Sequence, residues 1–539
     1  MFVLHSRCWK EVWTHEAAFD IREIYMRTSS SLRTLMASFL GQFVNIILLF
    51  ISRKLFVQHF AQEYLGVNGL FSNILTVLSL AELGIGTAMI HGLYRPAANS
   101  DEEEICRLMN LYRMLYGVVG SAVFVFGLAL MPVLPYFVQG SGIPGLRLIY
   151  GMYLFDTVAG YFLSYKQAML AAHQEAWRTT AVTQMVRSIQ IILQMAVIVC
   201  LENFYIYIAV QMCSQLVANF ILSGIVNHRY PYLRGNKRGY PSREYCRELF
   251  QQIGALALHR LGGVLVSHTD NLILSTFRGL AVVGIYSNYQ MVLNSIRLMM
   301  SYIYNSFSPA IGNLAASEES DRVYEIHSAL DFLMSLLYGW LALCLAALFN
   351  PFIRLYFGSD YVLSLPVVLL IVLDFYLHGM RQMTLRFRDG MGLYWYDRYK
   401  PMAEILLNLT ASVVLVRRFG IAGVVAGTVV STLLTNFWVE PLVFFRYGVR
   451  DGWKRKFVWY YIRRGAQALV LITDGIILWM LHMKMPVHNF TDWLVWGGLC
   501  TALYGLTISV AFRRRKEWRY LCAKGVEQWK ILKKKFGKI

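Results

Sequence analysis

Stretches of about 20 residues with almost no charged side chain recur along the whole chain, and they limit the fold more than any other feature. Helices of that length cross a hydrocarbon core about 30 Å thick, whereas the strands of membrane barrels alternate in polarity and span only about ten residues. Only 15% of the 539 residues are charged, against about a quarter in soluble domains. The pattern therefore predicts an all-α polytopic membrane protein.

The apolar runs predict about fourteen transmembrane helices. They are 35–57, 64–91, 112–137, 146–165, 180–201, 204–227, 251–276, 280–307, 330–350, 362–383, 402–417, 421–445, 460–481 and 491–512.

Lysine and arginine predict the orientation, because positively charged loops stay on the cytoplasmic side. With the N-terminus inside, 40 of the 51 basic residues fall in cytoplasmic segments and eight fall outside. The other three, Arg187, Arg260 and Arg297, lie within predicted spans. We therefore expect a multi-pass protein of the bacterial plasma (inner) membrane with both termini in the cytoplasm.

The net charge of +19 follows mostly from this bias, so nucleic acid is not needed as a partner. In residues 513–539, Trp518, Leu521 and Trp529 recur at helical spacing among many lysines. This pattern is typical of an amphipathic helix that lies on anionic membrane lipids. A disordered basic tail is the alternative.

Two pairs of similar segments indicate an internal repeat, for which coincidental short matches are the alternative. The segment QLVANF at 215–220 is echoed by TLLTNF at 432–437, and YLGV at 64–67 is echoed by VVGI at 282–285. The shifts are 217 and 218 residues. A unit with an even number of helices keeps its orientation when it is duplicated, so a parallel repeat with two six-helix lobes is predicted.

The repeat also predicts the domain organisation. It consists of a cytoplasmic tail (1–34), an N-lobe (35–228), a cytoplasmic linker (229–250), a C-lobe (251–446), an accessory two-helix hairpin (447–512) and a basic cytoplasmic tail (513–539).

Polar side chains line one face of several predicted spans, and the arginines among them are candidate ligands of an anionic substrate. Ionisable groups at this depth are costly and usually face an aqueous cavity or a partner. A guanidinium group binds phosphate through two parallel hydrogen bonds and keeps its proton. The candidate substrate-binding residues are Arg260, Arg297, Arg187, Asn294 and Asn271.

Acidic residues in the spans leave two interpretations open. Glu82, Asp156 and Asp270 either bind a coupling cation or proton, or pair with an arginine of another helix. Asp374, Glu404, Glu440 and Asp474 are weaker candidates for the same roles. The motifs of soluble enzymes and metal-ligand spacings are missing from the sequence, so we expect neither catalytic residues, a metal nor a cofactor.

Several segments resemble the polysaccharide biosynthesis (O-antigen-type) flippases of the multidrug/oligosaccharidyl-lipid/polysaccharide exporter superfamily. They are YLGVNGLF at 64–71, LSLAELGIGTA at 78–88, TDN at 269–271, VGIYSNY at 283–289 and GIAGV at 420–424. The resemblance covers about residues 35–450. It implies two six-helix lobes and alternating access.

The function expected from the resemblance and the cationic stripe is that of a flippase for a polyprenyl-diphosphate-linked oligosaccharide, destined for a surface polysaccharide. The expected partners are this lipid-linked glycan, anionic membrane lipids and glycan-assembly enzymes. The alternatives are a drug or cation exporter of the same superfamily, a membrane glycosyltransferase or polymerase, and a non-transporting scaffold.

Overall fold

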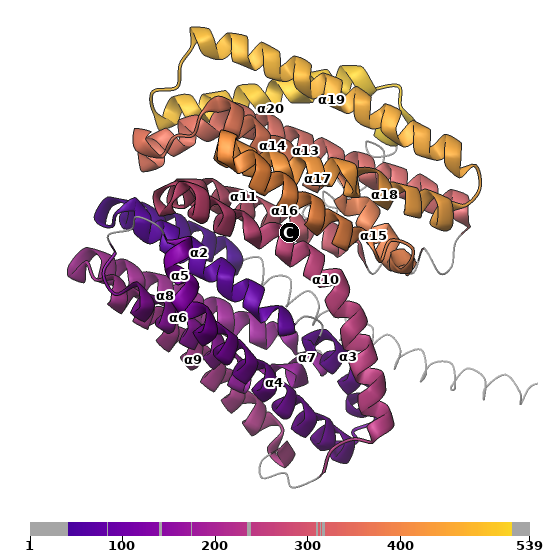
Figure 1. The fold of residues 1–539 in the computed structure, drawn as a ribbon. Helices are drawn as coiled ribbons and strands as arrows, with labels where there is room; N and C mark the ends of the chain where they lie inside the picture. Colours follow the sequence, from indigo (N-terminus) through magenta and orange to yellow (C-terminus); the bar gives the residue numbers. More distant parts are fainter. Residues whose placement is uncertain are drawn as a thin grey trace, which may run out of the picture. The chain divides into compact units, whose positions relative to one another are not determined.

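The computed structural model describes residues 41–82, 85–138, 143–173, 175–233, 239–308, 311–312, 314 and 319–519 (Figure 1). Every regular element in these residues is helical, which confirms the predicted all-α class. Nine of the described helices are long and apolar enough to cross a membrane. The total of fourteen spans stays a prediction, and the predicted tails at 1–34 and 520–539 lie outside the described residues.

The chain divides into two compact units, of which the first contains residues up to Ala61, Ile74–Pro135 and Ile143–Arg260. Its helices are Gly41–His59, η1 (Ser79–Glu82), α3 (Ile85–Ala98), α4 (Glu102–Leu130), η2 (Met131–Val133), α6 (Leu146–Ser164), α7 (Gln167–Ala172), α8 (Ala176–Leu201), α9 (Phe204–Arg229) and η3 (Pro231–Leu233).

The second unit contains Gln62–Asn73, Tyr136–Gly142 and the residues from Leu261 onward. Three helices have residues in both units: α2 (Gln62–Leu78), α5 (Leu134–Phe137) and α10 (Arg243–Arg278). The other elements of the second unit are α11 (Leu280–Ser306), α13 (Ser320–Phe357), η4 (Ser359–Tyr361), α14 (Leu365–Met380), α15 (Gln382–Gly390), η5 (Leu393–Trp395), α16 (Lys400–Phe419), α17 (Ile421–Leu434), α18 (Asn436–Val443), η6 (Phe444–Val449), α19 (Trp453–Lys484) and α20 (Phe490–Phe512).

The predicted span 64–91 is divided between two helices. Helix α2 ends at Leu78, and the Ser79 hydroxyl donates a 2.8 Å hydrogen bond to the carbonyl oxygen of Leu75. A tight η1 turn follows before α3 begins at Ile85. Serine side chains that bond back to the preceding turn compete with the regular helical pattern, which is a physical reason for the interruption.

Helices α2 and α11 approach each other through two glycines at equivalent places in the repeat. A Cβ atom on Gly66 would collide with the carbonyl oxygen of Leu280, and one on Gly284 would collide with that of Gln62. Positions 66 and 284, like 62 and 280, are 218 residues apart, so the two contacts are reciprocal. Reciprocal contacts are the signature of a two-fold relation, and small residues permit such close helix packing.

A second pair of equivalent contacts follows the 217-residue shift. In the first unit the Lys166 ammonium donates a 2.8 Å hydrogen bond to the hydroxyl of Ser223 on α9. In the second unit the Lys400 ammonium donates to the carboxylate of Glu440 on α18, and 440 is the counterpart of 223. Both copies therefore hold a lysine from a preceding segment against the same position of their last helix.

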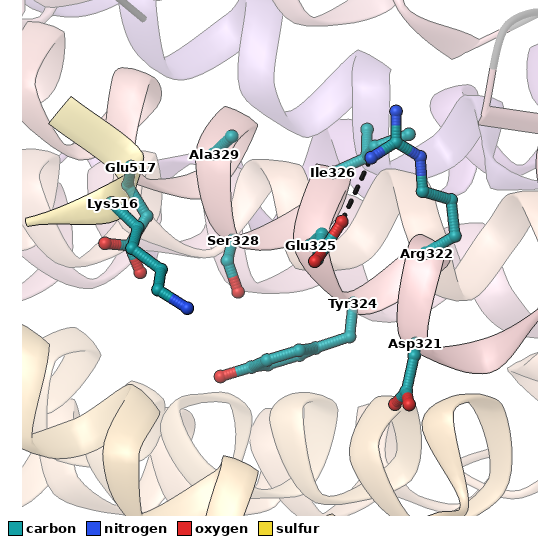
Figure 2. A pocket seen from close by; sticks show the side chains of 9 residues that line it. All are labelled: Asp321, Arg322, Tyr324, Glu325, Ile326, Ser328, Ala329, Lys516 and Glu517. Carbon is teal, nitrogen blue, oxygen red and sulfur yellow. Dashed lines mark hydrogen bonds and ion pairs between the residues drawn. The ribbon is translucent and has the colours of Figure 1, made fainter. Parts of the chain in front are cut away.

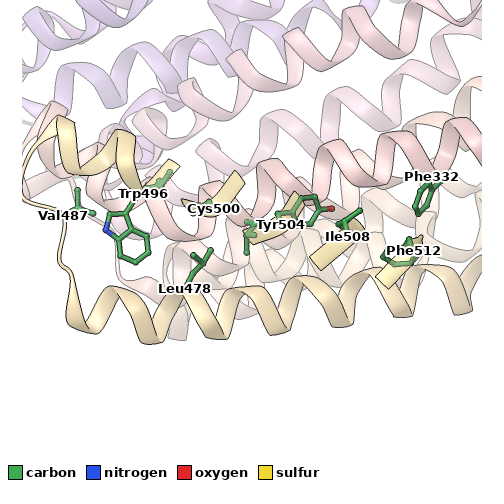
Figure 3. Packing of buried hydrophobic residues seen from close by; sticks show 10 residues of the cluster. Phe332, Leu478, Val487, Trp496, Cys500, Tyr504, Ile508 and Phe512 are labelled. Atoms are coloured by element: carbon green, nitrogen blue, oxygen red, sulfur yellow. The ribbon is translucent and has the colours of Figure 1, made fainter. Parts of the chain in front are cut away.

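The helices of the C-terminal hairpin, α19 and α20, pack on α13 (Figure 3). Helix α20 contributes a stripe at every fourth residue, which meets Phe332 of α13 and Leu478 of α19. The opposite side of α20 exposes Leu494, Leu506 and other apolar side chains, as a surface that faces lipid does. The buried stripe consists of Trp496, Cys500, Tyr504, Ile508 and Phe512.

A buried ion pair also joins the hairpin to the rest of the second unit. Arg464 of α19 lies 2.5 Å from Asp331 of α13, and both side chains are almost fully buried. The same guanidinium donates to the hydroxyl of Ser335 and to the carbonyl oxygen of Met380. The hairpin is therefore tied to α13 by polar contacts as well as by apolar packing.

Candidate functional site

Arg297, one of the three arginines predicted to bind substrate, is held by a carboxylate. It projects from α11, and its Nη2 lies 3.0 Å from Oδ2 of Asp374 on α14. Its Nη1 donates a 3.5 Å hydrogen bond to Oδ1 of Asn294, one helical turn earlier. The side chains of Arg297 and Asp374 are 25% and 21% exposed. The pair is therefore partly desolvated but still reachable.

The Arg297 guanidinium retains a free donor. Its Nε is buried and has no hydrogen-bond partner among the described residues. A buried donor without a partner is costly, and ligands frequently satisfy such groups.

Asp270 of α10 belongs to the same charged cluster. Arg297 and Asp374 are the charged groups that act on it most strongly, and its Oδ1 is buried without a hydrogen-bond partner among the described residues. One guanidinium and two carboxylates carry a net charge of about −1 when all are ionised. Arg381, which binds Glu440, also acts on Asp374 and adds positive charge near this cluster.

Neighbouring polar groups on α10 face α2. The ring Nδ1 of His268 lies 3.0 Å from Oδ1 of Asn73. Asn271 lies beside Gly69, where its Nδ2 would be 3.5 Å from an added Cβ, and its Oδ1 is buried without a partner in the described part of the chain. The predicted residues Asp270, Asn271, Asn294 and Arg297 thus all occur in the second unit.

Arg260 and Arg187 belong to the first unit. The backbone of Arg260 is part of α10, but its side chain lies outside the described residues, so its predicted role is neither supported nor weakened. Arg187 is exposed on α8, and no ion pair joins it to another described residue. On the same helix Gln184 and Ser188 hydrogen-bond to Asn45 of the first helix, at 2.5 and 3.0 Å.

The predicted acids of the first unit have neutral partners. Oδ2 of Asp156 on α6 accepts a 2.8 Å hydrogen bond from Nε2 of Gln211 on α9, while its Oδ1 is buried without a described partner. Glu82 accepts a 3.3 Å hydrogen bond from the hydroxyl of Tyr116 on α4. Neither carboxylate pairs with an arginine among the described residues.

Sequence reasoning gave too little weight to Glu440, which is the centre of a buried charge network. Arg381 donates to both of its oxygens, at 2.9 and 2.5 Å, and Lys400 donates to one of them. Arg388 forms a second ion pair with Asp397 close by, and Asp397 also lies 3.7 Å from Lys400. The available signal was the carboxylates themselves, Asp374 and Glu440, which stand alone in otherwise apolar runs.

Within the described part of the chain, no group of three or more histidine, cysteine, aspartate or glutamate side chains is placed to hold a metal ion.

Comparison with known families decides the class of the protein. Residues 31–315 match the family described as "Polysaccharide biosynthesis protein", which is more than half of the chain. The chain belongs to this family. The match confirms the resemblance found in the sequence, over residues 35–315 of the segment 35–450. None of the curated proteins compared with the chain matches it.

Solved structures of low sequence identity share the fold. Lipid II flippase MurJ in an inward closed conformation has a TM-score of 0.61 at 12% identity, covering 89% of this chain and 98% of its own. An inward-facing multidrug resistance MATE family transporter of the MOP superfamily has a TM-score of 0.59 at 13% identity, covering 78% and 95%. A variant of the Vibrio cholerae MATE transporter VcmN reaches 0.52 at 13% identity, covering 79% and 99%.

The family match and the shared fold together identify a multi-pass membrane protein of the flippase and exporter class. The fold alone is common to transporters with different cargo, so the substrate has to be argued from the residues of the site.

Proposed function

We propose that this member of the polysaccharide biosynthesis family moves a polyprenyl-diphosphate-linked oligosaccharide from the inner to the outer leaflet of a bacterial plasma membrane by alternating access. Moving a diphosphate and many sugar hydroxyls through hydrocarbon without polar partners is prohibitive. A guanidinium within the membrane supplies such a partner for the diphosphate. The observation that carries the proposal is Arg297, partly exposed and with a spare buried donor.

In this mechanism Asp374 holds Arg297 until substrate arrives. The diphosphate competes with Asp374 for the guanidinium, and the released carboxylate is then neutralised by a proton or a cation. Asn294 and Asn271 supply amide donors for the head group, while Arg260 and Arg187 of the first unit stay separate candidates for binding the anionic cargo. The prenyl chain stays in lipid.

The membrane potential is a sufficient driving force for such an anion. With the cytoplasm negative, outward movement gains about 2.3 kcal/mol per charge for each 100 mV. A coupled ion is therefore optional, and Glu82, Asp156 and Asp270 are the candidates for binding one.

The test is flipping of a fluorescent prenyl-diphosphate-linked sugar by the purified protein in proteoliposomes, with R297Q, D374N and the double variant R297Q/D374N. We expect R297Q to lower apparent substrate affinity roughly tenfold or more, since a hydrogen bond to a charged group contributes about 1.5–3 kcal/mol. D374N, which leaves Arg297 free for the diphosphate, should bind substrate at least as tightly as the wild type.

The double variant separates substrate binding from a structural role. It removes both charges of the pair, so a purely structural pair would allow normal flipping once neither partner is left alone. We expect R297Q/D374N to remain as defective as R297Q. Flipping at the wild-type rate in the double variant would refute the assignment of Arg297.

Export of a cationic compound is the second candidate, because one observation favours it. The cluster of Asp270, Asp374 and Arg297 has one carboxylate more than it has guanidinium groups, and Oδ1 of Asp270 has no described partner. Uptake of ethidium into wild-type proteoliposomes, abolished in D270N and accompanied by no lipid flipping, would establish this candidate instead.

A further inference from the structure

A pocket of about 430 Å³ lies at the first turns of α13, in the second unit (Figure 2). Seven of its lining residues fall between Asp321 and Ala329, and the other two, Lys516 and Glu517, follow the end of α20. None of the residues that line the pocket belongs to the cluster of Arg297, Asp374 and Asp270. Nothing in the proposed transport mechanism uses this pocket.

The three acidic residues of the pocket are already paired. Asp321 lies 2.5 Å from the ammonium of Lys456, and Glu325 lies 3.0 Å from the guanidinium of Arg322. Glu517 lies 2.8 Å from Arg463 of α19. The acids therefore offer no unbalanced negative charge to a cation.

Lys516 is the unbalanced charge of the pocket. Its side chain is exposed, and no ion pair joins it to another described residue. Arg513, Arg514, Arg515 and Arg519 surround it in sequence and add to the positive potential.

Ser328 gives independent evidence of a missing ligand. It is only 4% exposed, and its Oγ is buried without a hydrogen-bond partner among the described residues. In Figure 2 the Ser328 hydroxyl, the Tyr324 hydroxyl and the Lys516 ammonium face the same open space. Behind Glu517, Nη2 of Arg463 is also buried without a described partner.

The rest of the lining and the position of the pocket favour a lipid over a free anion. Ile326 and Ala329 supply an apolar wall beside the polar groups. Helix α13 has 38 residues and is therefore about 57 Å long, well beyond a hydrocarbon core of about 30 Å. The pocket is lined by the first turns of α13 and by the residues that follow the apolar helix α20. The ends of membrane-spanning helices lie at the level of the lipid head groups.

We propose that this pocket binds the phosphate group of an anionic glycerophospholipid, with Lys516, Ser328 and Tyr324 as donors and Ile326 and Ala329 against the glycerol and first methylene groups. A free phosphate monoester shares the same donors, but it leaves the apolar wall uncovered. Bound lipid would tie the end of α20 to the first turns of α13. The proposal does not depend on what the protein transports.

The experiment measures lipid binding by the full-length protein in detergent, by native mass spectrometry and by thermal unfolding. The probes are dioleoylphosphatidylglycerol, dioleoylphosphatidylcholine and soluble glycerol 3-phosphate. We expect saturable binding and stabilisation with phosphatidylglycerol, a weaker effect with phosphatidylcholine, and little effect of glycerol phosphate at the same concentration.

Three variants localise the binding. K516Q should weaken phosphatidylglycerol binding roughly tenfold, and S328A should weaken it by a few-fold, because a charged donor contributes more than a hydroxyl. R519Q removes an equal charge three residues further on, outside the lining, and should bind as the wild type does. Lys516 and Arg519 are exposed and Ser328 is buried, so thermal unfolding of each variant without lipid checks that it is folded.

Two outcomes would overturn the proposal. Equal losses in K516Q and R519Q would show that only the diffuse positive field attracts lipid. Binding of glycerol phosphate as tightly as the lipid would assign the pocket to a soluble phosphate instead.

Discussion

Residues 223 and 440 occupy equivalent places in the two copies of the repeat. The two copies differ in the group that accepts a hydrogen bond from a lysine there. In the first unit Lys166 donates to the hydroxyl of Ser223 and to the amide oxygen of Asn227. In the second unit Lys400 donates to Glu440, which also binds Arg381. The same helix geometry thus supports either a polar contact or a buried ionic network.

The difference extends to several acids of the predicted spans, although Glu404 and Asp474 of the second unit also have neutral partners, Asn436 and Thr507. Asp156 and Glu82 of the first unit have amide and phenol partners, whereas Asp331, Asp374 and Glu440 of the second unit have arginine partners. Removal of one member of a buried ion pair leaves an uncompensated charge and costs about 3–5 kcal/mol, whereas loss of a neutral hydrogen bond costs about 1 kcal/mol. Asp331, Asp374 and Glu440 should therefore be far more sensitive to single substitutions than Asp156 and Glu82.

The largest effect is expected for Glu440→Gln. Its carboxylate is fully buried against Arg381 and Lys400, so neutralising it should lower the free energy of unfolding by about 3–5 kcal/mol. The equivalent change in the first unit, Ser223→Ala, should cost only about 1 kcal/mol. Denaturant unfolding of the purified protein in detergent, followed by tryptophan fluorescence, measures both.

A second-site change provides the control for Glu440. Replacing Lys400 by Met in the Glu440→Gln background removes one of the two stranded cations and should recover part of the lost stability. If Glu440→Gln and Ser223→Ala cost the same, the contrast between the two units would be wrong.

The next largest loss of stability is expected at Gly66 and Gly284, which form the close helix contact that the two copies share. A valine at Gly66 would collide with the carbonyl oxygen of Leu280, and one at Gly284 with that of Gln62. The atoms in the way belong to the backbone, which cannot move aside as the end of a flexible side chain can. Each substitution should therefore lower the free energy of unfolding by about 1–3 kcal/mol. The measurement is the midpoint of the same denaturant titration.

Gly117 is the matched control for these two glycines. No atom lies within 4 Å of a Cβ added there, so Gly117→Ala should leave stability unchanged or raise it slightly. Unequal losses for Gly66→Val and Gly284→Val would argue against a reciprocal contact between α2 and α11.

The helical class and the repeat could be predicted from the sequence, because apolar runs and repeated short segments are visible in the sequence itself. Apolar runs of membrane length leave few alternatives to a helix, and the 218-residue echo around Gly66 and Gly284 is matched by contact in the structure. The interruption after Leu78 could not be predicted, since it depends on a side chain that bonds back to its own helix.

The ion pairs were beyond sequence reasoning for a different reason. Arg297 is recognisable as a charge in an apolar run, but Asp374 is 77 residues away and on another helix. Which acid neutralises which base depends on helix rotation and crossing, and these are set by packing. The sequence therefore predicted Arg297 as a candidate substrate ligand and left a cross-helix ion pair open, but it could not identify Asp374 as the partner.

The smallest effect is expected for Asp156→Asn in the first unit. An asparagine can still accept the hydrogen bond from Gln211, and it removes a buried charge that has no cationic partner among the described residues. Its free energy of unfolding should change by no more than about 1 kcal/mol, in either direction, whereas Asp374→Asn leaves the Arg297 guanidinium without its carboxylate and should cost more. Thermal and denaturant unfolding of the two variants side by side measures the difference. A loss at Asp156→Asn as large as that of Glu440→Gln would contradict the contrast and point to a cation on Asp156, where Glu440 is balanced by Arg381 and Lys400.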